Sequence, residues 1–436
     1  MRQEEALVVW IGLAACVALG LVPRLLPPTA ALIPVGGLAG LAAWTLLSLT
    51  WAESDERVAL ELARVLHYLG LLVLALALLS TSTWRWAAGG VFAGAVVVCG
   101  LATASRLYPG SFPDSEVERL FDIKRLSYPL NYWNALGAWA AMTIAAGLAI
   151  SAHARVLLVR MAALAVLPLS AAVIYMTFSR AGIAGAALAV GAAIALARNR
   201  WLVAVHAAAA GLGAFVVVET LRRHDAVAEG TGTAGSGRVL LALALAAGIG
   251  VAAAGFTSLA KGDKRWRLPA PWGRIALAAA AVVVLVVGTA AARDTVNEAW
   301  DDFTDQPVAT TQNDPEDRLS NLKGTRYEIW KSAIRAAEDN PIQGVGPGAF
   351  EFWWNGDDGG EHIRDAHSLY LEQAAELGIP GGLLVVAFVL GLAGVAVLVR
   401  LRLSRSRSIG ICAAMAAVSV VYVFHAGVDW MWESTA

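Results

Sequence analysis

Charged side chains are scarce in this sequence. Of its 436 residues only 15% are charged and 58% are hydrophobic, and the mean hydropathy is +0.61. These values lie far from the composition of soluble globular domains and exclude a soluble protein. The 33 Lys and Arg residues are balanced by 34 Asp and Glu residues. A net charge of -1 provides no basic surface, which excludes nucleic acid as a partner.

Cysteine is also rare. The three cysteines, Cys16, Cys99 and Cys412, all lie within apolar runs. Cysteines in such surroundings behave as small hydrophobic side chains. The sequence therefore favours neither a disulfide framework nor a cysteine-based metal site.

Apolar runs of about 20 residues recur along almost the whole chain, each long enough to cross roughly 30 Å of hydrocarbon as a helix. They predict an all-α integral membrane protein with about 12 transmembrane helices. The first run is kept as a permanent span because no charged leader or small-residue cleavage site accompanies it. The expected spans are 6–22, 29–50, 58–80, 87–104, 132–151, 156–178, 181–198, 201–219, 238–260, 274–292, 380–400 and 409–430.

Loop charges predict the orientation of these spans. The basic clusters within 261–274 and 400–407 favour the cytoplasm, and alternation then places the long polar segment 293–379 outside. The turn at Ser179-Arg180 falls on the same outer side. We expect four consecutive parts, which are listed here in order: N-terminal transmembrane helices (1–124), central transmembrane helices (125–292), a large extracytoplasmic loop (293–379) and C-terminal transmembrane helices (380–436).

The large loop has a helical pattern of its own. Arg326, Ile329, Trp330 and Ala333 share one face of a helix that Asn340-Pro341 should end. A glycine-rich turn follows, with glycines at 344, 346 and 348. Gly344, Gly346 and Gly348 permit positive φ and close approach of the backbone, and the turn lacks the Lys-Ser/Thr of a nucleotide-binding loop.

His367 lies near the predicted start of the next helix, at about Asp365, and is a candidate general base. The alternative is an interfacial histidine with only a structural hydrogen bond. A metal site built from Asp357, Asp358, Asp365 and His367 is disfavoured because their spacing matches no zinc-binding helix motif.

Arg180, in the sequence TFSRAG, lies between two apolar runs. An arginine at the edge of the hydrocarbon usually faces the bundle interior or a water-filled cavity, although its side chain could instead reach the outer head groups. Glu61 and Arg64 are predicted to form an ion pair inside a span. His425 and Asp429 are four residues apart near the end of the last span, where they could line a cavity or pair with each other.

Five segments, in this order, resemble the O-antigen ligase and O-antigen polymerase superfamily of bacterial polytopic membrane glycosyltransferases. They are TFSRAG, GTRYEIWKSAI, NPIQGVGPGAF, DAHSLYLEQAAELGIPGGLL and FHAGVDWMW, and RLSYPLNYWNALGAW at 125–139 is similar to the family as well. Together these segments extend the resemblance over residues 125–432. Members of this family usually continue beyond the DWxW motif, whereas this sequence ends at Ala436, which leaves open whether the C-terminus is truncated.

The resemblance implies a GT-C-like bundle with one large, partly helical extracytoplasmic loop in the bacterial cytoplasmic membrane. It also implies transfer of a glycan from a polyprenyl (undecaprenyl) diphosphate donor to a hydroxyl acceptor, which is a glycan, a lipid or a protein. In this family the transfer is inverting and needs neither metal nor cofactor. Carried over by motif, Arg180 and Arg326 bind the diphosphate, His367 is the catalytic base, and Gly344, Gly346 and Gly348 support the site.

Ligase and polymerase share these motifs, so both remain open. The competing hypothesis is a polytopic transporter or flippase for a lipid-linked or small polar substrate. It is disfavoured because charges within the spans are few and no pair of interrupted helices indicates an inverted repeat. A sensor or scaffold with a folded outer loop is a third alternative, and it predicts that His367→Ala leaves function intact.

Overall fold

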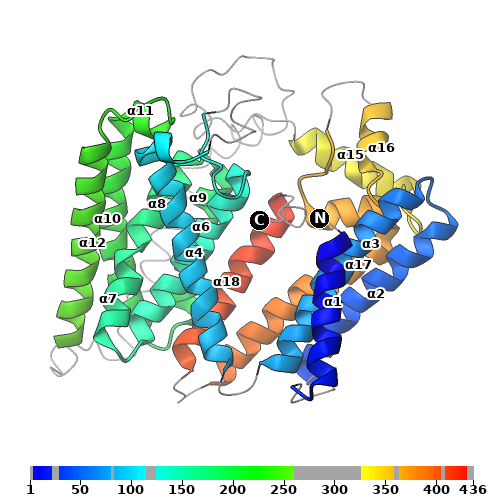
Figure 1. The fold of residues 1–436 in the computed structure, drawn as a ribbon, viewed down its shortest axis with the longest axis horizontal. Coiled ribbons are helices and arrows are strands. Elements are labelled where there is room, and N and C mark those ends of the chain that lie inside the picture. Colours follow the sequence, from blue (N-terminus) through cyan, green and yellow to red (C-terminus); the bar gives the residue numbers. More distant parts are fainter. Residues whose placement is uncertain are drawn as a thin grey trace, which may run out of the picture. The chain divides into compact units, whose positions relative to one another are not determined.

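The computed structural model describes residues 3–21, 29–79, 83–113, 124–259, 326–357, 363–403 and 408–429, in which every regular element is a helix (Figure 1). The first elements are α1 (Gln3–Ala18), η1 (Thr29–Ala31), α2 (Leu32–Leu47), η2 (Ser48–Thr50), α3 (Asp55–Leu78), α4 (Trp84–Leu107) and η3 (Pro109–Ser111). Next come α6 (Trp133–His153), α7 (Leu157–Ala165), α8 (Leu167–Met176), α9 (Arg180–Leu196), α10 (Arg200–Arg222), α11 (Asp225–Ala228) and α12 (Ser236–Leu259). The last are α15 (Arg326–Asp339), α16 (Phe350–Asp357), α17 (Leu369–Arg402) and α18 (Ile409–Val428).

Nine helical segments among the described residues are long and apolar enough to span a membrane, and each coincides with an expected span. The all-α membrane class is thereby confirmed. Two further expected spans, 6–22 and 181–198, are the shorter helices α1 and α9. The expected span 274–292 lies outside the described residues, and the order of four parts along the sequence stays a prediction.

The chain divides into two compact units that are not continuous in sequence. The first comprises Met1–Gly89, Arg326–Val399 and Tyr422–Ala436, and the second comprises Gly90–Thr325 and Arg400–Val421. Three of the four dividing points fall within α4, α17 and α18, and the fourth lies immediately before α15. The helices within residues 293–379, called the polar insert below, therefore belong to the same unit as the N-terminal spans.

The first unit has a membrane core of large aliphatic residues from α2, α3 and α17. Leu38 and Leu41 of α2 and Val385 of α17 are fully buried in it. The two helices approach closely at Gly37, where an added Cβ would lie 2.8 Å from the backbone nitrogen of Phe388. Small residues permit such backbone approach within a membrane, where packing rather than water expulsion holds helices together.

Helix α17 consists of two helices in one run. Gly378 interrupts it with φ 69° and ψ -176°, and Pro380 follows as an early residue of the second part. A Cβ at Gly378 would lie 2.4 Å from the carbonyl oxygen of Ile342, so the left-handed conformation and the close contact both require glycine. The break separates Leu369–Leu377 from the apolar part that was predicted as a span from residue 380.

The second unit is built around α6, which is the most buried of the candidate spans, with 78% of its window inside the protein. Its alanines and glycines pack against α9, where a Cβ added at Gly182 would lie 3.4 Å from the Cα of Gly137. Helices α10 and α12 run side by side in the same unit (Figure 1). Helices α7 and α8 form one bent span, with Pro168 at the start of α8.

Buried charged side chains in two of the spans make polar contacts. Arg64 donates to Glu61 across 2.6 Å, which confirms the predicted internal ion pair. Arg160 in α7 carries a further charge, and it is only 2% exposed. Its Nε donates to the carbonyl oxygen of Ser151 at 2.9 Å and its Nη1 to Oγ of Ser258 at 2.8 Å, so it links α6, α7 and α12.

Gly37→Ala should destabilise the protein, because the added methyl group collides with backbone that cannot rotate away. Overpacking of this kind costs about 1–3 kcal/mol. Thermal unfolding in detergent measures the effect. Gly36→Ala is the matched control, since nothing lies within 4 Å of a Cβ at Gly36. A melting temperature of Gly37→Ala equal to that of Gly36→Ala would contradict the close approach of α2 and α17.

Candidate active site

The polar insert forms a small core of its own in the first unit. Ile329 and Ala333 of α15, Phe350 of α16 and Ala375 of α17 are buried together. Ile329 and Ala333 lie on the predicted apolar face, and α15 ends at Asp339, immediately before Asn340-Pro341 as expected. This core fixes the position of Arg326, which is the first residue of α15.

Arg326 pairs with the end of the last helix. Its Nη2 donates to Oδ2 of Asp429 at 3.2 Å. The Asp429 side chain is fully buried, whereas that of Arg326 is 28% exposed. A buried carboxylate requires a charged partner, and the guanidinium keeps donors available on its exposed side.

His367 forms a dyad with Asp365. Its Nδ1 lies 2.8 Å from Oδ1 of Asp365 and 3.2 Å from the Asp365 carbonyl oxygen. The side chain of His367 is 27% exposed and that of Asp365 is 11% exposed. A carboxylate on Nδ1 favours the tautomer that leaves Nε2 free to accept a proton.

The charges around His367 raise its pKa above 6.5. Burial is the largest single influence and lowers the pKa, as does the charge of Arg326. The contact with Asp365 and the charges of Asp365 and Asp429 act in the opposite direction and together outweigh burial. Arg326 and Asp429 therefore lie close enough to His367 for their charges to act on its pKa.

His367 precedes α17 and does not lie within it, which corrects the predicted helix start near Asp365. The helix begins at Leu369, and His367 adopts a left-handed conformation with φ 50°. Oε2 of Glu372 accepts a hydrogen bond from the Ala366 N–H at 2.9 Å, so the preceding turn is held by a side chain of the first helical turn. A residue other than glycine with positive φ is uncommon, and such strain often marks a functional site.

Tyr370 connects the His367 turn to the last helix. Its hydroxyl donates to the carbonyl oxygen of Val423 in α18 at 3.0 Å, and its ring lies against Gly427. The start of α17 is thereby held beside the end of α18, which carries Asp429.

The glycine-rich turn packs on the end of the first part of α17, just before the break at Gly378. Gly344, Gly346 and Gly348 all have positive φ, at 67°, 107° and 65°. A Cβ at Gly344 would lie 2.3 Å from the carbonyl oxygen of Glu376, and the N–H of Gly346 donates to that oxygen at 2.9 Å. The predicted close backbone approach is present, although the partner is α17.

Arg57, near the start of α3, also holds the glycine-rich turn in place. The sequence analysis did not identify this residue. Its Nη1 donates to the carbonyl oxygen of Gly348 and its Nη2 pairs with Glu351 at 3.0 Å. Its guanidinium lies 4.3 Å from the ring centre of Phe352. Residues almost 300 positions apart form these contacts, and no local pattern around Arg57 distinguishes it from an ordinary helix-start arginine.

His425 does not pair with Asp429, which was one of the two expected arrangements. Its side chain is fully buried in α18, and neither ring nitrogen has a hydrogen-bond partner among the residues that the structure describes. Buried polar atoms without partners are rare because each loses the hydrogen bonds that water would provide. The charge of Arg326 acts on His425 as it does on His367, so two imidazoles lie near this guanidinium.

Arg180 lies in the second unit, half-buried at the first residue of α9. Ser179 caps this helix by accepting from the Gly182 N–H at 3.2 Å, and it donates to Oδ1 of Asn134 at 2.9 Å. This hydrogen bond joins the TFSRAG segment directly to the segment 125–139.

Arg125 is a second residue that sequence reasoning missed. It is 8% exposed, and its Nε donates to the carbonyl oxygen of Thr177 at 2.7 Å. Its Nη2 reaches Oδ1 of Asn134 at 3.1 Å, and its guanidinium lies 4.5 Å from the Trp133 ring centre. Arg125 therefore holds the turn that precedes Arg180, and the signal available in the sequence was an arginine close to an apolar segment.

Residues 235–386 match the family model described as O-Antigen ligase. The matched region contains Arg326, the glycine-rich turn and His367, and Arg180 and Asp429 lie outside it. A comparison with curated proteins finds no match. The match supports a ligase- or polymerase-type function in polysaccharide assembly and, with the apolar helices, a multi-pass membrane protein. Over residues 235–386 this match agrees with the resemblance to the O-antigen ligase and polymerase superfamily that the sequence motifs indicated.

Proposed function

We propose that this protein transfers a glycan from a polyprenyl (undecaprenyl) diphosphate-linked donor to a hydroxyl acceptor on the outer face of the bacterial cytoplasmic membrane. The acceptor is a glycan, a lipid or a protein, and the enzyme acts as a ligase or a polymerase. The observation that carries the proposal is the dyad of His367 and Asp365 beside the Arg326–Asp429 pair, all within one unit.

In the proposed reaction, Nε2 of His367 accepts the proton of the acceptor hydroxyl. The hydroxyl oxygen then bonds to the anomeric carbon of the donor sugar as the bond from that carbon to the phosphate oxygen breaks. Polyprenyl diphosphate leaves with the electron pair, and the configuration at the anomeric carbon inverts. Asp365 holds Nδ1 and stabilises the imidazolium that forms.

The two arginines are assigned to the diphosphate. A guanidinium presents parallel N–H donors that match two phosphate oxygens, and its charge stabilises the negative charge that grows on the leaving group. Arg326 pairs with Asp429 through Nη2, and its side chain remains 28% exposed. Arg180 is the second proposed diphosphate ligand. Because two guanidiniums supply the charge, the reaction is proposed to need no metal.

The glycine-rich turn is assigned a supporting role. Gly344, Gly346 and Gly348 allow this turn to pack directly on the end of the first part of α17, which leads back to His367. The buried nitrogens of His425 supply a further place where a phosphate or sugar hydroxyl of the substrate would complete a hydrogen bond.

Arg180→Ala, Arg326→Ala and His367→Ala should each reduce glycan transfer in proteoliposomes by a factor of 100 or more, on the order expected for loss of a general base or a charged donor. Arg180→Lys should fail as well, because an ammonium cannot bind two phosphate oxygens in parallel. Lys331→Ala, on the exposed side of α15, is the control and should keep wild-type activity. Wild-type transfer by any of the first three variants, at equal protein in the membrane, would remove that residue from the site.

Asp365→Asn should lower the pKa of His367, because it removes the charge that raises it. A base acts only when neutral, so wild-type activity falls as the pH drops through the raised pKa, and the variant should move this acidic limb to lower pH. Histidine NMR titration and the pH profile of transfer measure the two effects. Asp339→Asn, a change at an exposed carboxylate of α15, should move neither. A shifted NMR titration with an unmoved acidic limb would show that His367 is not the base.

A further inference from the structure

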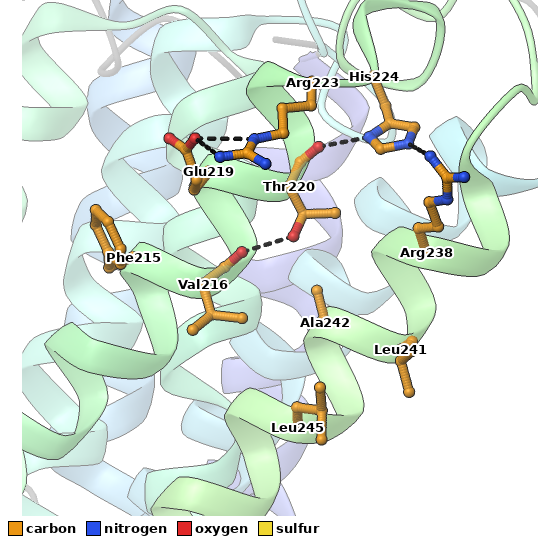
Figure 2. Close-up of a pocket in the computed structure, with 10 residues that line it drawn as sticks. All are labelled: Phe215, Val216, Glu219, Thr220, Arg223, His224, Arg238, Leu241, Ala242 and Leu245. Carbon is orange, nitrogen blue, oxygen red and sulfur yellow. Dashed lines mark hydrogen bonds and ion pairs between the residues drawn. The ribbon is translucent and has the colours of Figure 1, made fainter.

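A pocket lies in the second unit, between the ends of α10 and α12 that residues 223–235 connect. Its volume is about 480 Å³, within the range of small-ligand sites. Figure 2 shows that polar side chains gather at one end and apolar side chains at the other. None of the residues assigned to glycan transfer lines this pocket.

The polar end is rich in guanidinium groups. Arg223 and Arg238 line it together with one carboxylate, Glu219. Both Nε and Nη2 of Arg223 donate to Oε1 of Glu219, at 3.0 and 2.7 Å, and Arg222 approaches the other oxygen at 3.9 Å. The single negative charge of Glu219 is thus shared by two arginines, and Arg238 adds a third positive charge.

His224 holds Arg238 over the pocket. Its Nδ1 lies 2.8 Å from the Thr220 carbonyl oxygen, which can only accept, so Nδ1 carries the proton. The other nitrogen, Nε2, then accepts from Nη1 of Arg238 at 3.3 Å. Within the described part of the chain Arg238 contacts this neutral acceptor and no carboxylate, so its charge is uncompensated.

A glycine in the connection between α10 and α12 makes room for the His224 ring. Gly235 has φ 99°, and a Cβ there would lie 1.9 Å from the ring of His224. Only glycine fits against the imidazole at this position. The His224–Arg238 contact is therefore built into the connection between the two helices.

The apolar end is formed by side chains on the outer faces of two membrane-spanning helices. Phe215 of α10 is 67% exposed, and Leu241 and Leu245 of α12 are 60% and 56% exposed. These residues lie within candidate spans, where the medium is lipid, and they continue directly from the charged end (Figure 2). A ligand that fits must carry an anionic group at the depth of the head groups and an apolar chain next to it.

We propose that this pocket binds an anionic phospholipid of the membrane. Its phosphodiester contacts Arg238 and Arg223, and the first part of one acyl chain lies between Phe215 and Leu245. Charge complementarity identifies the occupant, because two arginines face one carboxylate in the lining and a zwitterionic head group would bring its own cation to the same place. The proposal is independent of the glycosyl-transfer proposal.

Native mass spectrometry of the full-length protein in detergent, titrated with phosphatidylglycerol, tests this site. Arg238→Gln should weaken binding about tenfold, the size expected for one lost charged hydrogen bond. Leu245→Ala should weaken it severalfold without any change of charge. Arg200→Gln, at the opposite end of α10, removes the same charge and should bind like the wild type. Phosphatidylcholine with the same chains should bind more weakly than phosphatidylglycerol.

Equal loss of binding in Arg200→Gln and Arg238→Gln would overturn the proposal, since it would show a general charge effect. Unchanged binding in Leu245→Ala, or complete displacement of the lipid by inorganic phosphate, would indicate a phosphate site with no chain and would overturn it too. Tighter binding of a polyprenyl phosphate than of phosphatidylglycerol, with the same sensitivity to Arg238→Gln, would replace the proposed occupant.

Discussion

The carboxylate of Asp429 is fully buried at the end of α18, and much of the first unit follows from that constraint. Removing a carboxylate from water is costly unless a cation and hydrogen bonds compensate. Arg326 supplies the cation, and because it is the first residue of α15, the ion pair ties the polar insert to the last span. The same two charges act on His367, where Asp429 raises the pKa and Arg326 lowers it.

Two breaks in regular structure place the groups around this ion pair. The left-handed Gly378 lets a short helix stand at an angle to the membrane-spanning part of α17, and the glycine-rich turn fills the space against the break. The left-handed His367 lies two residues before α17, and Glu372 of that helix accepts a hydrogen bond from the turn that carries His367. Both breaks involve a single left-handed residue, and the cores around Phe350 and Leu369 hold the surrounding segments in place.

The fold class, the positions of the spans and the bounds of α15 could be predicted because they depend on composition and on helical period. The Glu61–Arg64 pair could be predicted for the same reason, since three residues along a helix face place side chains together. The contacts of Arg57 with the glycine-rich turn, of Arg326 with Asp429 and of Arg125 with TFSRAG could not, because they join distant parts of the chain. Position 367 was found from its motif, whereas its left-handed backbone depends on the tertiary contacts of the turn.

The central claim is that the His367 dyad transfers a lipid-linked glycan. Its most direct test is deletion of the gene in its host, followed by profiling of the lipid-linked and surface glycans with the wild type and His367→Ala as complements. The account predicts that lipid-linked glycan accumulates and surface polymer is lost, that the wild type reverses both changes, and that His367→Ala reverses neither. Accumulated single repeat units would identify a polymerase, and accumulated long chains a ligase. Unchanged pools in the deletion strain, or full rescue by His367→Ala, would contradict the account.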